Sequence, residues 1–369
     1  DTTDVITVNM GQITSIKIVD SADQEIGTKS LTTDGSQTLY LRGYDQDSNK
    51  VYVPGTWTVL GGIGTVSPIY GTSTIFNPSK TGIGTISATD LTHTDTTGAI
   101  TVTAGCLAKI QIEDVGQEIE TVSITTNGSL TLYLKGYDAD DNLIGYVAAT
   151  WTVSGGIGSL TSIFGTSTVF YATSIGYGTI TATNRTNTAT ATIIVGRQID
   201  AFNPYIGTLT TGWGTATIRI GTNTESLIIL PPEPASGSFL QNLSGNIGVG
   251  IVVNAYGTSG NHFSGTLTNP VYIEIHYNEA QLGNIDENTL RLYISSDNGN
   301  TWGTITCSLD TAQNIILGTF SHFSIIAPAG ASKQVAAKNL TNIIAYPNPC
   351  KGHNKITFSN LTDQCKIRI

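Results

Sequence analysis

Two short acidic loops are the strongest candidates for chemistry in this sequence. Each carries Asp, Asp and Asn at alternate positions, and oxygen ligands at this spacing are typical of a calcium-binding loop. The glycine and the glutamate that complete an EF-hand loop are missing from both. We predict a tight turn, in which Asp and Asn tolerate unusual dihedral angles, with calcium binding as the alternative. The residues are Asp45, Asp47, Asn49, Asp138, Asp140 and Asn142.

The triplet His322-Phe323-Ser324 is the second candidate. A serine hydroxyl can attack the carbonyl group of the preceding residue while a neighbouring histidine polarises the peptide bond. Such chemistry would cleave the chain between Phe323 and Ser324, and it requires a strained bond and an aligned base. We favour the alternative, a terminal strand with Phe323 in the core.

The sequence offers no other set of catalytic residues. No two of the five histidines stand at the HxH or HxxxH spacing of a zinc site. Nucleophile-elbow, phosphate-loop and dinucleotide-binding motifs are also missing. The carboxylates are few and lie mostly in apparent turns, so no glycosidase pair can be nominated. We predict that the chain is not an enzyme and holds no cofactor.

The composition argues against two classes of partner. Only 12% of the 369 residues are charged, and the formal net charge is −10. Nucleic-acid binding requires clustered Lys and Arg, which an acidic, weakly charged chain does not supply. No apolar run reaches the roughly 18 residues of a membrane-spanning helix. The abundant Thr, Ser, Asn and Gly favour strands and tight turns.

Two kinds of covalent modification fit the sequence. Cys350 and Cys365 lie on either side of an expected strand, so a disulfide would form in an oxidising compartment. Free buried thiols are the alternative. Sequons for N-linked glycosylation add surface sites if the source glycosylates secreted proteins. They occur at Asn127, Asn184, Asn242, Asn339 and Asn360.

The acidic loops belong to a unit that is written twice. Tyr40–Asp45 returns as Tyr133–Asp138, and Trp57 and Trp151 stand in the same Thr-Trp-Thr-Val sequence. The period is 151 − 57 = 94 residues, which fits whole domains rather than a solenoid. Short stretches of period-2 alternation between turn residues predict about seven strands per unit and a β-sandwich. The two tryptophans are predicted to fill its core.

Residues 197–330 break the period but keep strand signals. Val271–Tyr277 alternates strictly between apolar and polar residues, which predicts a strand with one buried face. Ser295–Trp302 matches the Asp-box, a β-hairpin motif in which an Asp ties the turn and Trp302 packs beneath it. A binding function for this segment would use exposed aromatic residues as a platform for glycan or a partner protein. The platform residues considered are Tyr205, Trp213 and Tyr256.

Several of these motifs resemble known families. The sequence Leu-Tyr-Leu-x-Gly-Tyr-Asp-x-Asp, followed by Thr-Trp-Thr-Val, makes both repeats similar to the bacterial Ig-like (Big-type) domains of surface proteins and adhesins. Residues 197–330 resemble ZU5-type β-sandwich modules, and some ZU5-like and related modules cleave themselves at His-Phe-Ser. Tyr346–Pro349 resembles the start of a FlgD-like, Por-type C-terminal Ig module, although Cys350 stands where Phe is usual. These resemblances imply an extracellular stalk or spacer.

Residues 1–11 resemble the closing strand of a repeat whose body is missing. Val5–Gly11 reads like Ile100–Gly105 and Thr192–Gly196, which end the two repeats. Three explanations are open: further repeats upstream, an ordinary edge strand, or a strand donated to the open sheet edge of another subunit. Donation would build a homopolymer through the terminal strands.

We therefore predict an all-β, multidomain protein that is secreted or lies at the cell surface. Its predicted function is structural, as a subunit of a self-assembling filament, surface layer or stalk. The alternatives are an adhesin or glycan-binding module, and appended domains of a larger secreted enzyme. The predicted segments are an orphan strand (1–11), Ig-like repeats (12–105 and 106–196), a β-sandwich domain (197–330), a linker (331–342) and a partial Ig-like module (343–369).

Overall fold

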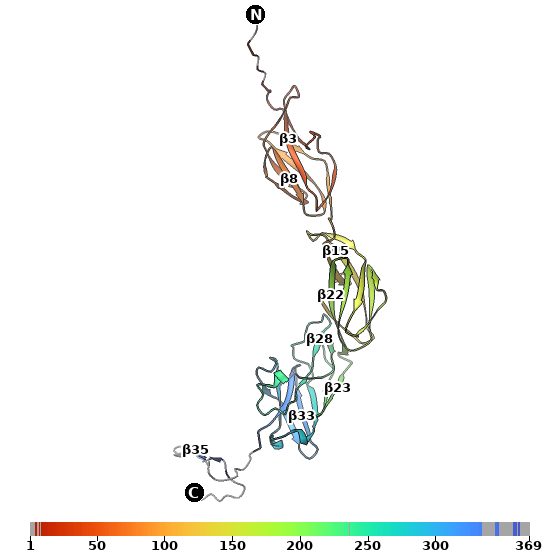
Figure 1. Ribbon diagram of the computed structural model, residues 1–369, viewed down its shortest axis with the longest axis vertical. Helices are drawn as coiled ribbons and strands as arrows, with labels where there is room; N and C mark the ends of the chain where they lie inside the picture. Colours follow the sequence, from red (N-terminus) through yellow and green to blue (C-terminus); the bar gives the residue numbers. More distant parts are fainter. Residues whose placement is uncertain are drawn as a thin grey trace. The chain divides into compact units, whose positions relative to one another are not determined.

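The computed structural model describes residues 4–5, 7, 9–235, 237–333, 344–346, 357–359 and 361. The chain is all-β, as predicted, with strands joined by turns and a few short 3-10 helices (Figure 1). It divides into two compact units. The first comprises Asp1–Val122 and Asn127–Ile193, and the second comprises Ser123–Thr126 and Ile194–Ile369. The division falls three residues before the expected end of the second repeat, and we describe each unit separately.

The first repeat is a sandwich of two sheets. One sheet has the order β1-β3-β8-β6, with β4 paired to β3, and the other has the order β2-β11-β9-β5-β7, with β10 paired to β9. Strand β11 lies between β2 and β9 in the second sheet, parallel to β2 and antiparallel to β9. The strands are β1 (Ser15–Val19), β2 (Lys29–Thr32), β3 (Gln37–Tyr44), β4 (Lys50–Tyr52), β5 (Gly55–Leu60), β6 (Gly64–Ser67), β7 (Tyr70–Gly71), β8 (Ser73–Pro78), β9 (Gly82–Thr89), β10 (Thr94–Thr96) and β11 (Ile100–Thr103).

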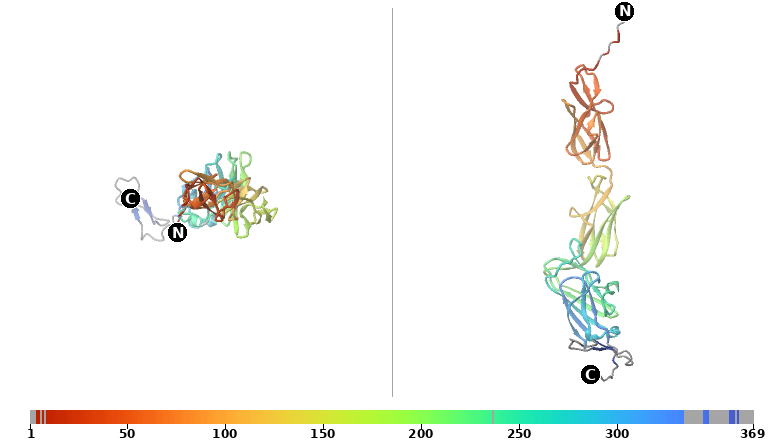
Figure 2. Two further views of the ribbon diagram at one scale, coloured as in Figure 1. Left: turned by 90° about the horizontal axis from the view of Figure 1, so that it is seen from above. Right: turned by 90° about the vertical axis from the view of Figure 1, so that its left-hand side faces the viewer.

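The second repeat has the same two-layer arrangement (Figure 2). Its first sheet has the order β13-β12-β15-β20-β18, with β16 paired to β15. Its second sheet contains β19-β17-β21-β22, with β14 paired to β22. The strands are β12 (Lys109–Asp114), β13 (Gln117–Glu118), β14 (Thr121–Thr125), β15 (Ser129–Tyr137), β16 (Leu143–Tyr146), β17 (Ala149–Val153), β18 (Gly158–Leu160), β19 (Phe164–Gly165), β20 (Ser167–Ala172), β21 (Gly176–Asn184) and β22 (Asn187–Ile199).

Period-2 alternation builds the cores of both repeats. In β3 and β15 alternate residues are buried, because successive side chains of a strand point to opposite faces of its sheet. Trp57 and Trp151 are 2% and 0% exposed. Their indole Nε1 groups donate to the carbonyl oxygens of Gly71 and Gly165 over 3.0 and 2.9 Å. Each ring therefore fills the core while its polar atom is satisfied.

The second unit contains a larger sandwich. Its two main sheets have the orders β23-β24-β29-β33-β32 and β26-β27-β34-β30-β31, and the end of β22 pairs with β25, which pairs with β28. The strands are β23 (Tyr205–Thr211), β24 (Gly214–Ile220), β25 (Leu227–Ile229), β26 (Glu233–Pro234), β27 (Ile251–Val252), β28 (Ala255–Gly257), β29 (Val271–Tyr277), β30 (Arg291–Ser295), β31 (Gly303–Thr304), β32 (Thr306–Asp310), β33 (Ile315–Phe320) and β34 (Ile325–Ala329). Three 3-10 helices, Gly237–Leu240, Glu279–Gln281 and Glu287–Thr289, lie in its loops.

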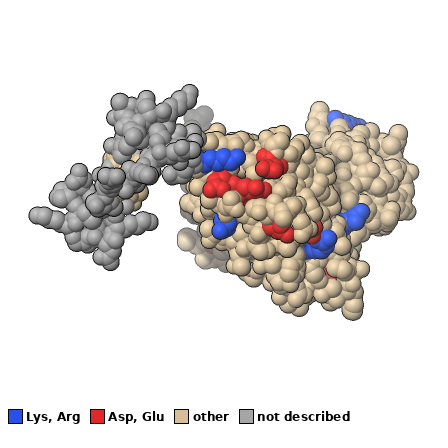
Figure 3. Space-filling view, turned by 90° about the horizontal axis from the view of Figure 1, so that it is seen from below, with Lys and Arg blue, Asp and Glu red and all other residues tan. Residues whose placement is uncertain are grey.

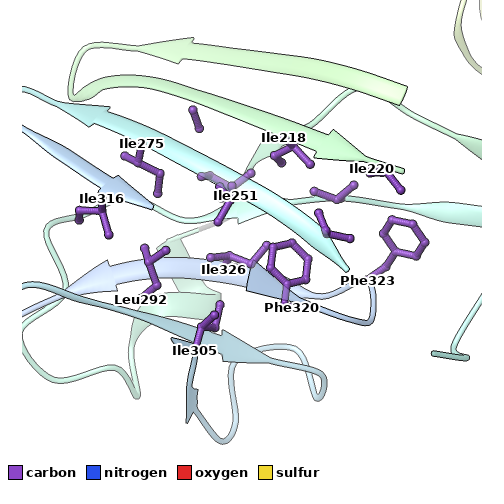
Figure 4. Packing of buried hydrophobic residues seen from close by; sticks show 14 of the residues in the cluster. Ile218, Ile220, Ile251, Ile275, Leu292, Ile305, Ile316, Phe320, Phe323 and Ile326 are labelled. Atoms are coloured by element: carbon purple, nitrogen blue, oxygen red, sulfur yellow. The ribbon is translucent and has the colours of Figure 1, made fainter. Parts of the chain in front are cut away.

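The strand predicted at Val271–Tyr277 is β29, with the predicted register. Val271, Ile273, Ile275 and Tyr277 are buried, and the residues between them are not. Apolar side chains from β24, β29 and β33 meet those from β27, β30 and β34 between the two sheets (Figure 4). This core is separate from the core of the first repeat around Trp57.

The two ends of the chain bear on several expectations. The described residues before Ser15 carry no assigned strand, and Val5 is 93% exposed. At the other end β35 (Ile344–Tyr346) pairs with β36 (Thr357–Ser359) as a hairpin. The expected disulfide partners, Cys350 and Cys365, lie outside the described residues, as do the sequon residues Asn339 and Asn360.

The surface carries little charge. In the view of Figure 3, a few acidic side chains lie close to basic side chains on a mostly uncharged surface. Among the described residues, no helix is both long and apolar enough to cross a membrane.

Candidate functional site

The first acidic loop is a turn tied by Asp45. The Oδ1 atom of Asp45 accepts hydrogen bonds from the backbone N–H groups of Asp47 and Asn49, over 3.0 and 2.8 Å. Its Oδ2 atom accepts from the Asn49 side chain and from the backbone N–H of Gly11, each over 3.0 Å. Ser48 takes a φ of 66°, the left-handed conformation that closes the turn. The carboxylate thus holds both its own loop and the segment that leads into the repeat.

The second acidic loop repeats this turn and adds a contact to the first repeat. Asp138 Oδ1 accepts from the backbone N–H groups of Asp140 and Asn142, over 3.0 and 2.8 Å. Asp138 Oδ2 accepts from the backbone N–H of Gly105, at 3.0 Å, and from the hydroxyl of Thr33, at 2.6 Å. Thr33 follows β2 of the first repeat, so this buried carboxylate joins the two repeats.

Asn142 makes a second set of bonds across the same junction. Its Oδ1 accepts from the backbone N–H of Thr81, and its Nδ2 donates to the carbonyl oxygen of Ser79, both over 3.0 Å. Both partners lie in the turn between β8 and β9 of the first repeat. The side-chain amide also donates to the Asp138 carboxylate. One loop of the second repeat therefore holds two separate turns of the first, and we call this set of contacts the repeat junction.

The charge at the repeat junction is strongly stabilised by hydrogen bonds. Burial of Asp138 opposes ionisation, but the bonds from Thr33, Gly105 and Asn142 outweigh it and hold the pKa of Asp138 well below its usual range. At Asp45 the Asn49 side chain is the largest cause of a lowered pKa, although burial works against it. Both carboxylates are therefore ionised at neutral pH.

The short connection between the repeats is packed against the junction. The backbone N–H of Cys106 donates to Asp34 Oδ2 over 2.5 Å. A Cβ atom at Gly105 would lie 2.4 Å from the Asp34 carboxylate, so a larger residue there would push the connection away. The Cys106 thiol is exposed, and its hydrogen bond to Asp34 raises its pKa.

These contacts favour the turn interpretation of the acidic loops over calcium binding. A calcium ligand presents its oxygen lone pairs to a cation. Here the Asp45 and Asp138 oxygens face N–H and O–H donors instead, and Asn142 Oδ1 faces an N–H. Among the described residues, no group of three or more His, Cys, Asp or Glu side chains is placed to hold a metal ion.

In the His322-Phe323-Ser324 triplet, Phe323 is a core residue and the side chains of His322 and Ser324 are in contact. Phe323 is 6% exposed and packs in the core of the second unit (Figure 4). Ser324 Oγ donates to the carbonyl oxygen of Phe323 over 2.6 Å, and His322 Nδ1 lies 2.7 Å from Ser324 Oγ. The Ser324 hydroxyl thus lies within hydrogen-bond distance of both the Phe323 carbonyl oxygen and the His322 ring, and self-cleavage stays a prediction.

The Asp-box forms the hairpin between β30 and β31. Asp297 accepts from the Ser295 hydroxyl over 2.8 Å, and from the backbone N–H and hydroxyl of Thr301 over 2.9 and 2.6 Å. These bonds, that of the Thr301 hydroxyl first, lower the pKa of Asp297 to about 2. The indole of Trp302 donates to the carbonyl oxygen of Gly299, and its half-buried ring packs on a small cluster around Leu240. The motif is structural here.

The predicted aromatic platform is wrong for two of its three residues. Trp213 and Tyr205 are 8% and 5% exposed and belong to the core of the second unit. Tyr256 is half-buried, with its ring edge-on to that of His262. Trp213 and Tyr205 were misjudged because an isolated aromatic residue between turn signals gives no indication of which face it occupies.

A different surface of the second unit is hollowed, and the platform prediction missed it. It lies on the outer face of β29 and β33, has a volume of about 480 Å³, and is bordered by the exposed side chains of Tyr272 and Leu317. Glu274 accepts from His276 over 2.6 Å and from Arg219 over 3.0 Å, and these bonds lower the pKa of Glu274. The alternation that predicted the buried face of β29 also placed Tyr272 and Glu274 on this outer face.

The described sequons differ in accessibility. Asn127 and Asn242 are exposed. Asn184 is half-buried, and its side-chain amide donates to the carbonyl oxygen of Ala148 over 2.7 Å. The Asn242 side-chain amide also donates, to the carbonyl oxygen of Gly299 over 3.3 Å. A glycan on Asn184 or Asn242 would therefore have to fit beside an existing contact.

Comparison with known proteins gives structural likenesses only. No protein-family model matches the sequence, and a search of curated proteins finds no match. Among solved structures, the Escherichia coli adhesin FdeC is 14% identical, with 88% of this chain and 96% of that chain covered and a TM-score of 0.30. Domains 4 and 5 of the S-layer protein SbsC are 18% identical (50% and 99% covered, TM-score 0.22), and the D00-D0 domain of intimin is 13% identical (49% and 98% covered, TM-score 0.28).

At these identities and TM-scores the likenesses carry no argument about function. The description of the chain as tandem Ig-like β-sandwiches rests on its own sheets, their order and their repeated cores.

Proposed function

We propose that this chain is a structural protein of the cell surface or extracellular space, in which Ig-like domains are coupled in series. The repeat junction carries this proposal. Asp138 and Asn142 bind three separate segments of the first repeat, at Thr33, at Ser79–Thr81 and at Gly105. Residues that could have formed an isolated surface turn are instead used to join two domains.

The repeat junction limits movement at the connection between the two repeats. Two domains joined only by a short flexible linker move relative to each other by default. Hydrogen bonds to an ionised, buried carboxylate are stronger than those between neutral groups, so the junction opposes that motion. A restrained connection is useful in a protein that transmits force or maintains spacing.

The assembled form that we propose is a filament, a surface layer or a stalk, with strand donation from residues 1–11 as the mode of joining. The exposed Val5 side chain supports this mode, since pairing with an open sheet edge would cover it. Glycans on Asn127 and Asn242 would lie on the exposed surface of such an assembly.

Electron microscopy of native material tests the proposal. We expect regular polymers or an ordered layer at the cell surface, and loss of surface labelling after proteolysis of intact cells. Protein found only inside cells would contradict the location. A monodisperse monomer that neither polymerises nor decorates the surface would contradict the assembled form.

A second candidate function, binding of glycan or a partner protein, is favoured by the hollow on the outer face of β29. Tyr272 supplies an exposed ring, and the Arg219–Glu274–His276 group supplies hydrogen-bonding atoms beside it. Glycan-array binding that is lost in Tyr272→Ala and retained in Ile206→Ala, an exposed position of the same unit, would support this function. Equal binding by both variants would contradict it.

A further inference from the structure

The lead-in to the first repeat has the same geometry as the lead-in to the second. The N–H of Gly11 bonds to Asp45 Oδ2 over 3.0 Å, and the N–H of Gly105 bonds to Asp138 Oδ2 over 3.0 Å. Three residues later, each lead-in segment bonds to the strand that precedes its acidic loop. The Thr14 N–H donates to the Tyr44 carbonyl oxygen over 2.8 Å, and the Ala108 N–H donates to the Tyr137 carbonyl oxygen over 2.9 Å.

The apolar packing of the two lead-in segments also matches. A Cβ atom at Gly43 would lie 2.9 Å from the side chain of Ile13, and one at Gly136 would lie 2.6 Å from the side chain of Leu107. Ile13 and Leu107 are one period apart, since 107 − 13 = 94. The chain therefore enters both repeats along the same path, and the sequence of residues 5–11 resembles the closing strand at residues 100–105.

The two loops differ in what covers them. Asn142 is 9% exposed because the turn at Ser79–Thr81 lies on it, whereas its counterpart Asn49 is exposed. Asp138 Oδ2 accepts the Thr33 hydroxyl, and within the described residues no hydroxyl occupies that position at Asp45. Among the residues that the structure describes, none donates a hydrogen bond to Asn49 Oδ1.

We propose that the surface formed by Asp45 and Asn49 binds the end of another Ig-like domain of this repeat type. The partner is defined by the chemistry of the repeat junction. It supplies a threonine hydroxyl to Asp45 Oδ2, and a turn whose N–H and C=O pair with the Asn49 side-chain amide. The end of the first repeat carries this set in Thr33 and Ser79–Thr81.

The occupant is a domain with an uncovered end rather than a second copy of this chain. In each copy, the end of the first repeat is already covered by the second repeat. The end of the second repeat keeps the threonine, as Thr126, but residues 173–175 replace Ser79–Thr81 in the turn, and Asn127 stands where the first repeat has Asp34. An additional repeat of the first type supplies the complementary groups in the correct register, because Gly11 and Gly105 occupy equivalent positions.

A chain with the first repeat duplicated tests the inference directly. In this protein residues 1–105 are followed by residues 12–369, so a new junction forms at the second copy of Asp45 and the original repeat junction is an internal standard. Segmental isotope labelling allows hydrogen exchange at the Thr81 amide of the added domain to be followed. We expect that amide to exchange about tenfold more slowly than in the same protein carrying Asn49→Ala in the second copy.

Small-angle scattering gives an independent readout. The duplicated protein should show a narrower distribution of inter-domain distances than its Asp45→Ala, Asn49→Ala variant. Equal exchange and equal scattering for the two proteins, with the original junction still protected, would overturn the inference. Self-association of the natural chain that depends on Asp45 and Asn49 would also overturn it, because the occupant would then be a second copy. Neither outcome depends on where the protein acts, so the result is separate from the proposed function.

Discussion

At the scale of single residues, one motif serves two purposes according to what lies next to it. Asp45 closes a surface turn, while Asp138, in the same sequence context, closes the same turn and also binds a neighbouring domain. The difference comes from a threonine 105 positions away in the sequence. No local pattern around Asp138 contains that information.

The depressed pKa of Asp138 gives a testable pH dependence. The carboxyl group has a pKa of about 3.9 in an unfolded chain and a lower one in the folded protein, so its contribution to stability is complete above about pH 4. That contribution is lost as the pH falls further towards the folded pKa. We expect the free energy of unfolding of the wild-type protein to fall between pH 4 and 2 more steeply than that of Asp138→Asn, measured by urea denaturation. Parallel curves would contradict this assignment.

Self-cleavage at Ser324 is the second prediction at this scale. Attack of Ser324 Oγ on the Phe323 carbonyl carbon forms a C–O bond and breaks the C–N bond to Ser324. His322 takes up the hydroxyl proton and passes it to the departing Ser324 amine, and water then hydrolyses the ester to a carboxylic acid and the serine hydroxyl. Intact-mass spectrometry of incubated protein should show fragments ending at Phe323 and beginning at Ser324. Ser324→Ala should abolish them and Ser324→Cys should retain them. A single uncleaved species in the wild type, over days at neutral pH, would leave only the core role of Phe323.

At the scale of elements, the sequence was most informative for strands in which apolar and polar residues alternate, because alternate side chains lie on the same face of the sheet. Alternation in Val271–Tyr277 predicted the buried side of β29, and the repeated Trp57 and Trp151 are in the cores. Burial of Trp213 was not predictable, because its neighbours form a turn and show no alternation. The repeat junction escaped prediction for another reason: its partners come from turns of two different domains.

The core tryptophans give a prediction at the element scale. Replacing Trp57 or Trp151 by Ala leaves a large cavity between the two sheets of its repeat, so each change should cost about 3–5 kcal/mol of unfolding free energy. Chemical denaturation of the full chain measures this. Leu91→Ala is the control, because the Leu91 side chain is fully exposed and its removal should change stability by less than about 0.5 kcal/mol. A loss below about 1 kcal/mol at either tryptophan would show that the core repacks.

At the scale of the whole molecule, the property that follows from the repeat junction is coupling between domains rather than stability of either one. The groups that couple the repeats lie at their ends, and the tryptophan cores lie within them. Coupling and folding should therefore be separable by mutation.

The double variant Asp138→Ala, Asn142→Ala tests that separation. It removes the bonds to Thr33, Thr81 and Ser79 but leaves both tryptophan cores in place. We expect a broader distribution of inter-domain distances in small-angle scattering, with near-native circular dichroism. The corresponding change at Asp45 and Asn49 in the natural chain should leave the coupling of the two repeats unchanged. A double variant with unaltered scattering would show that the connection at Gly105 is sufficient by itself.

The first repeat holds the complementary halves of the joint at its two ends, the threonine and turn at one and the aspartate–asparagine loop at the other. Unequal recombination between gene copies that adds or removes 94 codons would therefore always leave matching surfaces in contact. Descendants of such a gene would vary in length by whole repeats while every new boundary was already adapted to its neighbour. A lineage could thus change the number of domains in the chain without evolving a single new interface.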